Sequence, residues 1–224
     1  MKTRPILFSA PMVRALLDGS KSQTRRNAKF PDDTTSVEWV VDKETVPTGL
    51  PYTGWVIDCS APLSLPRKCP HGQPGDLLWV RETWAAADTM LYHYATDPPR
   101  YIAYKADLSA RCFDPEGPCN VEYWNFDKLK WKPSIHMWRW ASRITLEIVS
   151  VRVERLQNIS EDDALAEGVS VHPDHHHKPR ESIYSPVQAY RDLWESLNGP
   201  GSWDANPWVW VIEFKRLDTS KIND

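Results

Sequence analysis

The most reactive side chains of this sequence lie together in one short polar segment. Residues 21–26 read Lys-Ser-Gln-Thr-Arg-Arg and contain three cations, two hydroxyls and an amide, but no apolar residue. A lysine amine with a lowered pKa can deprotonate a threonine hydroxyl for attack on an acyl carbon, so Lys21 and Thr24 are candidate catalytic residues. Arg25 and Arg26 can instead contact phosphate. A solvated basic turn explains the same composition, and composition alone favours that explanation.

Two further groups of charged residues are candidates for a functional site. Arg81, Glu82 and Trp84 follow the apolar run 77–80, where a charge must be paired or must face a cleft. They are candidates for binding substrate or nucleic acid, with a structural ion pair as the alternative. Glu167 ends a short predicted helix, where a carboxylate gains nothing from the helix dipole. It therefore either lies on the surface or serves a site.

The cysteines and histidines do not show the spacing of a metal site. The four cysteines contain no C-x2-C pair, although His71 closely follows one of them, so we predict reduced thiols without zinc. They are Cys59, Cys69, Cys112 and Cys119. His172 and residues 175–177 lie among prolines and charged residues, which is typical of a solvated loop. No metal or cofactor is predicted.

Composition restricts the class of protein. The chain has 224 residues, with 27 Lys or Arg against 30 Asp or Glu and a net charge of −3. A mean hydropathy of −0.54 and the lack of any apolar run of about 20 residues exclude a membrane protein. The net charge excludes a uniformly basic nucleic-acid coat but permits a local basic patch. Because the N-terminal residues lack the apolar core of a signal peptide, we expect a cytoplasmic protein of a bacterial or phage-infected cell.

Proline and tryptophan are both abundant. The chain has 19 prolines against 9 glycines, which implies long, stiff and non-helical connections. The 12 tryptophans are either large core residues or, in one or two cases, stacking platforms for bases. We expect most of them to belong to the core.

Apolar periodicity and capping residues predict three helices, the last being the longest. Their start and end signals are Ser9 and Gly19, Ser160 and Gly168, and Ser185 and Gly199. Apolar or alternating runs predict strands at 37–41, 55–57, 77–80, 101–104, 144–153 and 208–214. In the run 144–153 the apolar side chains change parity after Ile148, which indicates a bulge or burial on both faces. Strands separated by helices and long loops predict an α+β protein built round a mixed or closed sheet.

Several motifs together resemble the ASCH family. They cover residues 6–26, 75–84, 151–168 and 208–214. Two further stretches, 133–137 and 206–210, are similar to a phage and prophage branch of that family. The resemblance implies a PUA-like β-barrel of mixed strands with flanking helices and long irregular insertions.

The same resemblance implies an activity. ASCH proteins are described as RNA-binding, and others as ribonucleases. Some small bacterial members are amidohydrolases that remove the acetyl group from N4-acetylcytidine with a lysine, a threonine and a glutamate. Those positions correspond to Lys21, Thr24 and Glu167 here. The first two stand in a G-x-K-x-x-T pattern that begins at Gly19.

The predicted organisation is a single ASCH-like domain over residues 1–217. Insertions are expected at about 27–74, 88–133 and 170–184. The segment 88–133 is expected to be irregular and aromatic, apart from one strand. Residues 218–224 are expected to form a flexible tail.

Three functions remain open. The first is a hydrolase of N4-acylated cytosine nucleosides, with Thr24 as nucleophile, Lys21 as base and Glu167 serving the leaving amine. The second is a binding module for RNA or a modified nucleobase, in which the arginines of both polar clusters hold phosphate and a cleft tryptophan stacks on a base. The third is a phage accessory protein that uses the fold as a scaffold for protein contacts. Because a binder of long RNA usually carries a clearer basic excess, the net charge favours the hydrolase.

Overall fold

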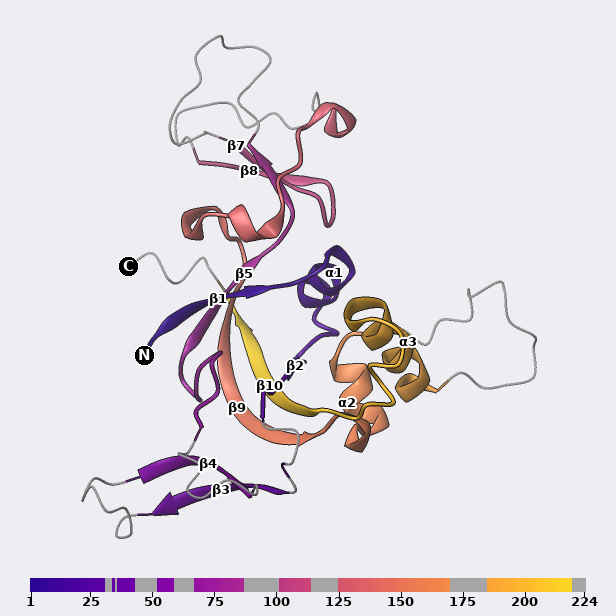
Figure 1. Ribbon diagram of the computed structural model, residues 1–224. Coiled ribbons are helices and arrows are strands. Elements are labelled where there is room, and N and C mark those ends of the chain that lie inside the picture. The colour runs from indigo at the N-terminus through magenta and orange to yellow at the C-terminus, as the bar shows by residue number, and fades with distance from the viewer. Residues whose placement is uncertain are drawn as a thin grey trace, which may run out of the picture. The chain divides into compact units, whose positions relative to one another are not determined.

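The computed structural model describes residues 1–30, 34, 36–42, 52–58, 67–86, 101–113, 125–169 and 185–218. The helices in this part of the chain are α1 (Ala10–Asp18), α2 (Glu161–Ala166) and α3 (Pro186–Asn198) (Figure 1). The strands are β1 (Thr3–Leu7), β2 (Gln23–Asn27), β3 (Ser36–Asp42), β4 (Tyr52–Asp58), β5 (Leu77–Arg81), β6 (Trp84–Ala86), β7 (Tyr101–Tyr104), β8 (Ser109–Cys112), β9 (Thr145–Arg155) and β10 (Trp208–Leu217). Short 3-10 turns are η2 (Phe126–Lys128), η3 (Ser134–His136), η4 (Arg139–Ala141) and η5 (Leu156–Asn158). The α+β class is confirmed.

The chain separates into two compact units that interleave along the sequence. The first unit contains residues 1–2, 20–76 and 147–215. The second contains residues 3–19, 77–146 and 216–224. The single domain over residues 1–217 stays a prediction, and each unit is described by itself below.

The strands form one larger sheet and two small ones. The larger sheet has the order β1-β5-β9-β10-β2, with β1 and β5 parallel and β10 and β2 antiparallel. The antiparallel pair β3-β4 and the three strands β6-β7-β8 form the others. In the described part of the chain no pairing joins the end strands β1 and β2, so the sheet is open there and the predicted PUA-like β-barrel stays a prediction.

The outer edge of β2 shows why the sheet stays open there. Ser22 donates its main-chain N–H to the carbonyl of Ala166 at 2.9 Å, and Lys21 and Glu167 form an isolated antiparallel bridge. The end of α2 therefore occupies the place that a further strand would take. Covering an edge in this way is a common means of preventing unwanted strand pairing.

Capping explains where the helices begin and end. Ser185 and Gln188 form a complete capping box at the start of α3, and the Ser160 hydroxyl accepts the N–H of Asp163 at the start of α2. The helix α1 ends as predicted at Gly19, whose φ of 85° is left-handed. Ser9 precedes α1, but its side chain makes no capping hydrogen bond, so its predicted capping role is wrong. The ring of Pro11 instead fixes the backbone φ angle in the first turn of the helix.

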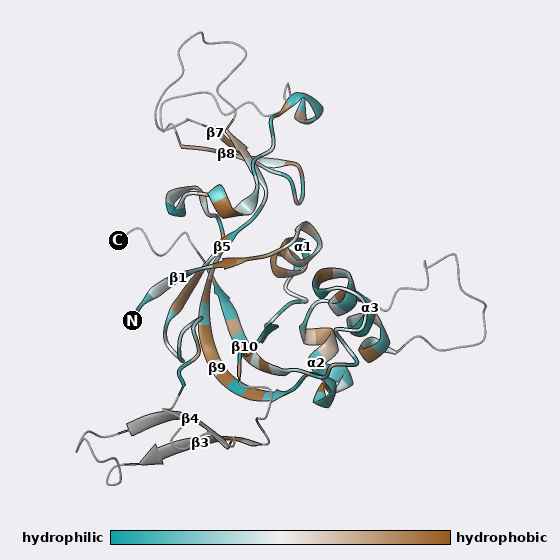
Figure 2. Cartoon of the chain, viewed as in Figure 1, coloured by the Kyte–Doolittle hydropathy of each residue, from teal (hydrophilic) through white to brown (hydrophobic). Residues whose placement is uncertain are grey.

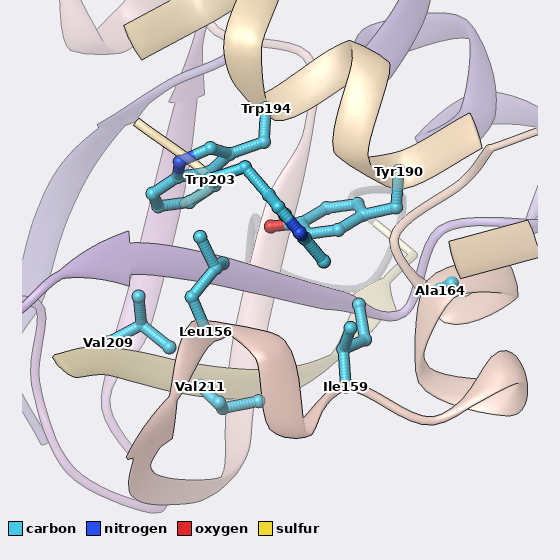
Figure 3. Close-up of a cluster of buried hydrophobic side chains, with 8 residues drawn as sticks. All are labelled: Leu156, Ile159, Ala164, Tyr190, Trp194, Trp203, Val209 and Val211. Carbon is cyan, nitrogen blue, oxygen red and sulfur yellow. The ribbon is translucent and has the colours of Figure 1, made fainter. Parts of the chain in front are cut away.

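A hydrophobic cluster in the first unit fixes α2 and α3 beside the sheet. Its buried members are Leu156, Ile159, Ala164, Tyr190, Trp194, Trp203, Val209 and Val211 (Figure 3). Tyr190 and Trp194 come from α3, four positions apart, so one face of that helix supplies both rings. Along β9, apolar and polar residues largely alternate (Figure 2), whereas β10 begins with a run of apolar residues, 208–212. The strand β9 is continuous, and its residues 150–155 are all half-buried, which agrees with burial on both faces.

The second unit has its own aromatic core. Trp84, Ile102, Tyr104, Met137 and Ala141 are buried together, and the Tyr104 hydroxyl donates to the Ala141 carbonyl at 2.8 Å. These residues come from β6, β7 and the turns η3 and η4. The expectation of an irregular segment with one strand is therefore too simple, because β7 pairs with both β6 and β8. Hairpins of this kind escape single-strand periodicity because each strand has only three or four residues.

Some predictions fall outside the described residues. These are Cys59, Cys119, His172, residues 175–177, the whole insertion at 170–184 and nearly all of the tail. Among the described helices, none is long and apolar enough to cross a membrane.

Candidate functional site

Residues 21–26 are not a solvated turn. Most of them belong to β2, which pairs with β10, and Lys21, Gln23, Thr24 and Arg25 are each at most 4 % exposed. The prediction of an exposed basic turn is wrong. Local composition cannot reveal the burial, because the carboxylate that pairs with Lys21 lies 146 positions away in the sequence.

The ammonium of Lys21 donates to three oxygens. One hydrogen bond reaches Oε2 of Glu167 at 2.8 Å, one reaches the Glu167 carbonyl at 2.7 Å, and one reaches the Gln23 carbonyl at 2.7 Å. An ammonium has three N–H donors, so these bonds engage all of them. The two side chains are 0 % and 2 % exposed, and together they form a buried ion pair at the edge of β2.

Burial lowers the pKa of Lys21 below its ordinary value of 10.5, because the charged amine loses its hydration. The charge and hydrogen bond of Glu167 partly reverse this effect, whereas the charges of Arg26 and Arg25 add to it. Lys21 can therefore release its proton at a lower pH than an exposed lysine. A lysine in this state is suited to act as a base.

Arg25 extends the ion pair into a network. Its Nη2 donates to the carboxylate of Glu154 and, at 2.9 Å, to Oδ2 of Asp163. Its Nη1 lies 3.5 Å from Oε1 of Glu167. Residues of β2, β9 and α2 are thus linked by charge around one buried guanidinium.

Arg152 of β9 adds a second cation to the network. It donates to Asp163 and Glu213, and its Nη2 lies 3.2 Å from the amide oxygen of Gln23, to which it also donates. Burial alone would raise the pKa of Asp163, but hydrogen bonds and charges from Arg25 and Arg152 outweigh it and lower that pKa. Asp163 therefore remains a carboxylate that holds both arginines.

Several buried polar atoms of this network have no hydrogen-bond partner among the described residues. They are Oε1 of Glu167, Nε and Nη1 of Arg25, and Nε2 of Gln23. Buried polar atoms are nearly always satisfied in native proteins, so a group of them is informative. Nη1 of Arg25 and Oε1 of Glu167 lie 3.5 Å apart as an ion pair, so Nε of Arg25 and Nε2 of Gln23 are the two donors that a water or an acceptor group of a ligand would satisfy.

Thr24 is buried in β2 directly opposite Ile212 of β10. Side chains alternate along a strand, so Thr24 lies on the opposite face of β2 from Arg25. None of the three hydrogen bonds of the Lys21 ammonium described above goes to the Thr24 hydroxyl. The structure brings Lys21 and Glu167 into contact and holds Thr24 in the strand that follows Lys21.

Tyr190 and Arg26 lie close to the same charges. The guanidinium carbon of Arg25 lies 5.9 Å from the centre of the Tyr190 ring. Burial raises the pKa of Tyr190 well above 10, and the charge of Glu167 raises it further. Burial lowers the pKa of Arg26, which the charges of Glu167 and Tyr190 partly reverse. The Tyr190 hydroxyl therefore stays protonated at ordinary pH.

Sequence reasoning did not propose Arg152, Glu154, Asp163 or Tyr190 as members of a site. Asp163 is explained equally well by the helix dipole at the start of α2, and Tyr190 by the apolar face of α3. Arg152 and Glu154 alternate with the valines of β9, so the local pattern assigns them to the solvent side of a strand and gives no signal of a site.

No protein-family model matches the chain. No curated protein and no solved structure matches it either. The ASCH family and the residue roles that it implies therefore stay predictions.

The second predicted cluster belongs to the other unit and is occupied by structural contacts. Glu82 is buried and accepts two hydrogen bonds from Arg143, at 2.8 and 2.9 Å. Arg81 lies over the ring of Trp79 at 5.3 Å. Trp84 is completely buried, so its predicted role in binding a base is wrong, because its ring offers no free face. For Glu82 the structural ion pair is the better explanation.

Metal ligation has no candidate in the described parts of the chain. Cys69 is buried there and Cys112 is partly buried. No group of three or more His, Cys, Asp or Glu side chains among these residues could hold a metal ion.

Proposed function

We propose that the protein is an ASCH-type hydrolase with a PUA-like fold that removes acyl groups from N4-acylated cytosine nucleosides. The observation that carries this proposal is the contact between Lys21 and Glu167. The resemblance alone singled out these two residues, which are 146 positions apart, and they lie 2.8 Å from each other in a buried ion pair. The lowered pKa of Lys21 is the property that a base in this reaction requires.

The reaction needs a nucleophile, a proton acceptor and a proton donor. Transfer of a proton from Lys21 to Oε2 of Glu167 leaves a neutral amine and a carboxylic acid. For the next step the amine must exchange one of its hydrogen bonds for the Thr24 hydroxyl, which lies on the other face of β2 from Arg25; it then accepts the proton as Oγ1 attacks the acyl carbon. The bond to N4 breaks as Glu167 returns its proton to the leaving amine. Water hydrolyses the resulting threonine ester, so the net products are cytidine and the carboxylic acid.

Release of acetate from N4-acetylcytidine tests the proposal. We expect Thr24→Val to lower the rate by at least about a thousandfold, because the nucleophile and its base act as a unit. Thr24→Ser keeps a hydroxyl and should retain activity. Ser22→Ala is the matched control, because it removes an exposed hydroxyl from the same segment. Equal rates for Thr24→Val and wild type would refute the nucleophile, and no release by wild type would refute the hydrolase.

The second candidate is a binding module for a modified nucleobase or RNA. The unsatisfied Nε of Arg25 and Nε2 of Gln23 favour it, because such donors can bind the acceptors of a base without any reaction. Calorimetry with N4-acetylcytidine and cytidine separates the two functions. Binding of the acylated nucleoside without release of acetate would support this candidate over the hydrolase.

A further inference from the structure

Two stacked tryptophans lie exposed on the second unit. Trp138 and Trp140 are 42 % and 39 % exposed, and their rings stack with centres 5.5 Å apart and planes inclined by only 15°. They flank Arg139 at the turn η4. Large exposed aromatic side chains that gather in one place usually mark an interaction surface.

Cations surround this aromatic pair. The ammonium of Lys132 lies 5.6 Å from the centre of the Trp138 ring. The guanidinium of Arg111 lies 5.0 Å from the centre of the Phe113 ring, and that ring meets Trp140 edge-on at 5.1 Å. Aromatic rings and cations thus alternate across one surface. We call the exposed side chains Arg111, Lys132, Trp138, Arg139 and Trp140 the aromatic–basic surface.

The local charge is opposite in sign to that of the whole chain. Residues 125–142 contain four Lys or Arg against one Asp, although the chain carries a net charge of −3. Among the described residues, neither Lys132 nor Arg139 takes part in an ion pair, and both side chains are exposed. These cations are therefore available to a polyanion that approaches from solvent.

A purely structural role does not account for both rings. Trp138 covers the buried Trp84, with ring centres 4.8 Å apart, and so closes the core of the unit. Trp140 is not among the buried residues of that core; it stacks on Trp138 and meets Phe113, which packs against the core. Packing of the core therefore does not explain why the Trp140 side chain remains 39 % exposed.

We infer that the aromatic–basic surface binds single-stranded nucleic acid. Unpaired bases stack on the exposed indoles, and Lys132, Arg139 and Arg111 contact the phosphates. Stacking on aromatic side chains next to cations is the usual way in which proteins hold single strands without reading their sequence. A duplex buries its base faces and so cannot use the indoles. This site is separate from the Lys21 cluster, and its ligand need not be a substrate of the proposed hydrolase.

Fluorescence anisotropy with labelled oligouridylate and oligothymidylate of about 12 nucleotides tests the inference. The two probes distinguish RNA from DNA, and the matching duplex serves as the negative probe. We expect Trp140→Ala to weaken binding of single strands by roughly five- to a hundredfold, and Trp140→Phe to restore most of it. Arg139→Ala should reduce the slope of log affinity against log salt by about 0.7, whereas Lys29→Ala, an exposed lysine of the first unit, should not.

The choice of variants separates a loss of binding from a loss of folding. Trp140→Ala is preferred to Trp138→Ala because Trp138 covers the core, and an unchanged near-ultraviolet circular dichroism spectrum confirms the fold. Absence of binding at low salt would overturn the inference. Binding that Trp140→Ala and Arg139→Ala leave unchanged would overturn it as well, because the strand would then lie elsewhere. Equal affinity for the duplex would also overturn the inference, because a duplex cannot stack its bases on the indoles and would bind by charge attraction alone.

Discussion

Replacing Lys21 by methionine tests whether the buried ion pair is essential to the fold. The variant keeps an unbranched apolar stem but removes three donors, which leaves Oε2 of Glu167 and two carbonyls without them. Removing one partner of a buried ion pair costs about 3–5 kcal/mol. Because Nη1 of Arg25 is only 3.5 Å from the other carboxylate oxygen, it can compensate in part. We therefore expect a loss in the lower part of that range, about 3–4 kcal/mol.

Urea unfolding followed by tryptophan fluorescence measures this loss as a lower midpoint with an unchanged slope. Lys29→Met removes an exposed lysine and should change stability by no more than about 0.5 kcal/mol. The double variant Lys21→Met/Glu167→Leu should recover most of the loss, because an apolar pair replaces the two charges. A loss below about 1 kcal/mol for Lys21→Met, as for an exposed ion pair, would show that our reasoning on burial is wrong.

The structure makes four more predictions. Because the pKa of Lys21 is lowered on folding, the unfolded chain binds more protons between that pKa and 10.5, so stability should rise with pH across this window in wild type; urea midpoints should show no such rise in Lys21→Met. Arg143→Met leaves Glu82 buried without its two-pronged partner and should cost about 3–5 kcal/mol, whereas Glu82→Leu/Arg143→Met should cost much less in thermal unfolding. Ser185→Ala and Ser160→Ala each remove a capping hydrogen bond and should cost about 1 kcal/mol, but Ser9→Ala should be nearly neutral because Ser9 makes none. In the native protein a thiol reagent should modify Cys112 faster than the buried Cys69. If all four cysteines are reduced, as predicted, the intact mass should be the same with and without reductant. Stoichiometric bound zinc would contradict the prediction that the cysteines hold no metal.

The helices and central strands could be predicted because their signals are local. In α3, the capping residues Ser185 and Gln188 and the spacing of Tyr190 and Trp194 all lie within one continuous segment. The strands β5 and β10 both begin with a short apolar run that follows turn residues. Propensity, capping and periodicity agree in each of these elements, which is the condition under which local sequence determines local structure.

The burial of residues 21–26 could not be predicted, because it depends on distant partners. Three cations in succession indicate a solvated segment unless carboxylates from elsewhere neutralise them. Here Glu154 lies 129 positions beyond Arg25 and Asp163 lies 138 positions beyond it. The sheet order has the same origin, because the end of α2 covers β2 through contacts that no local pattern encodes. Only the resemblance to a family connected Lys21 with Glu167 in advance.

The proposed function and a purely structural role make different demands on the Lys21 cluster. A buried ion pair is weak evidence for a stabilising role, since apolar residues of similar volume are often as good or better. If the network had only a structural role, we would expect its buried polar atoms to be hydrogen-bonded to one another. Each buried polar atom without a partner lowers the free energy of unfolding by about 1–3 kcal/mol. Here Nε of Arg25 and Nε2 of Gln23 have no hydrogen-bond partner among the described residues, and Oε1 of Glu167 has the 3.5 Å ion pair with Nη1 of Arg25 in place of a hydrogen bond. These atoms favour a group that completes the network from outside the chain. The double variant Lys21→Met/Glu167→Leu decides between the two explanations: recovered stability with lost deacylation or nucleoside binding indicates function, whereas recovered stability with both retained indicates a structural pair.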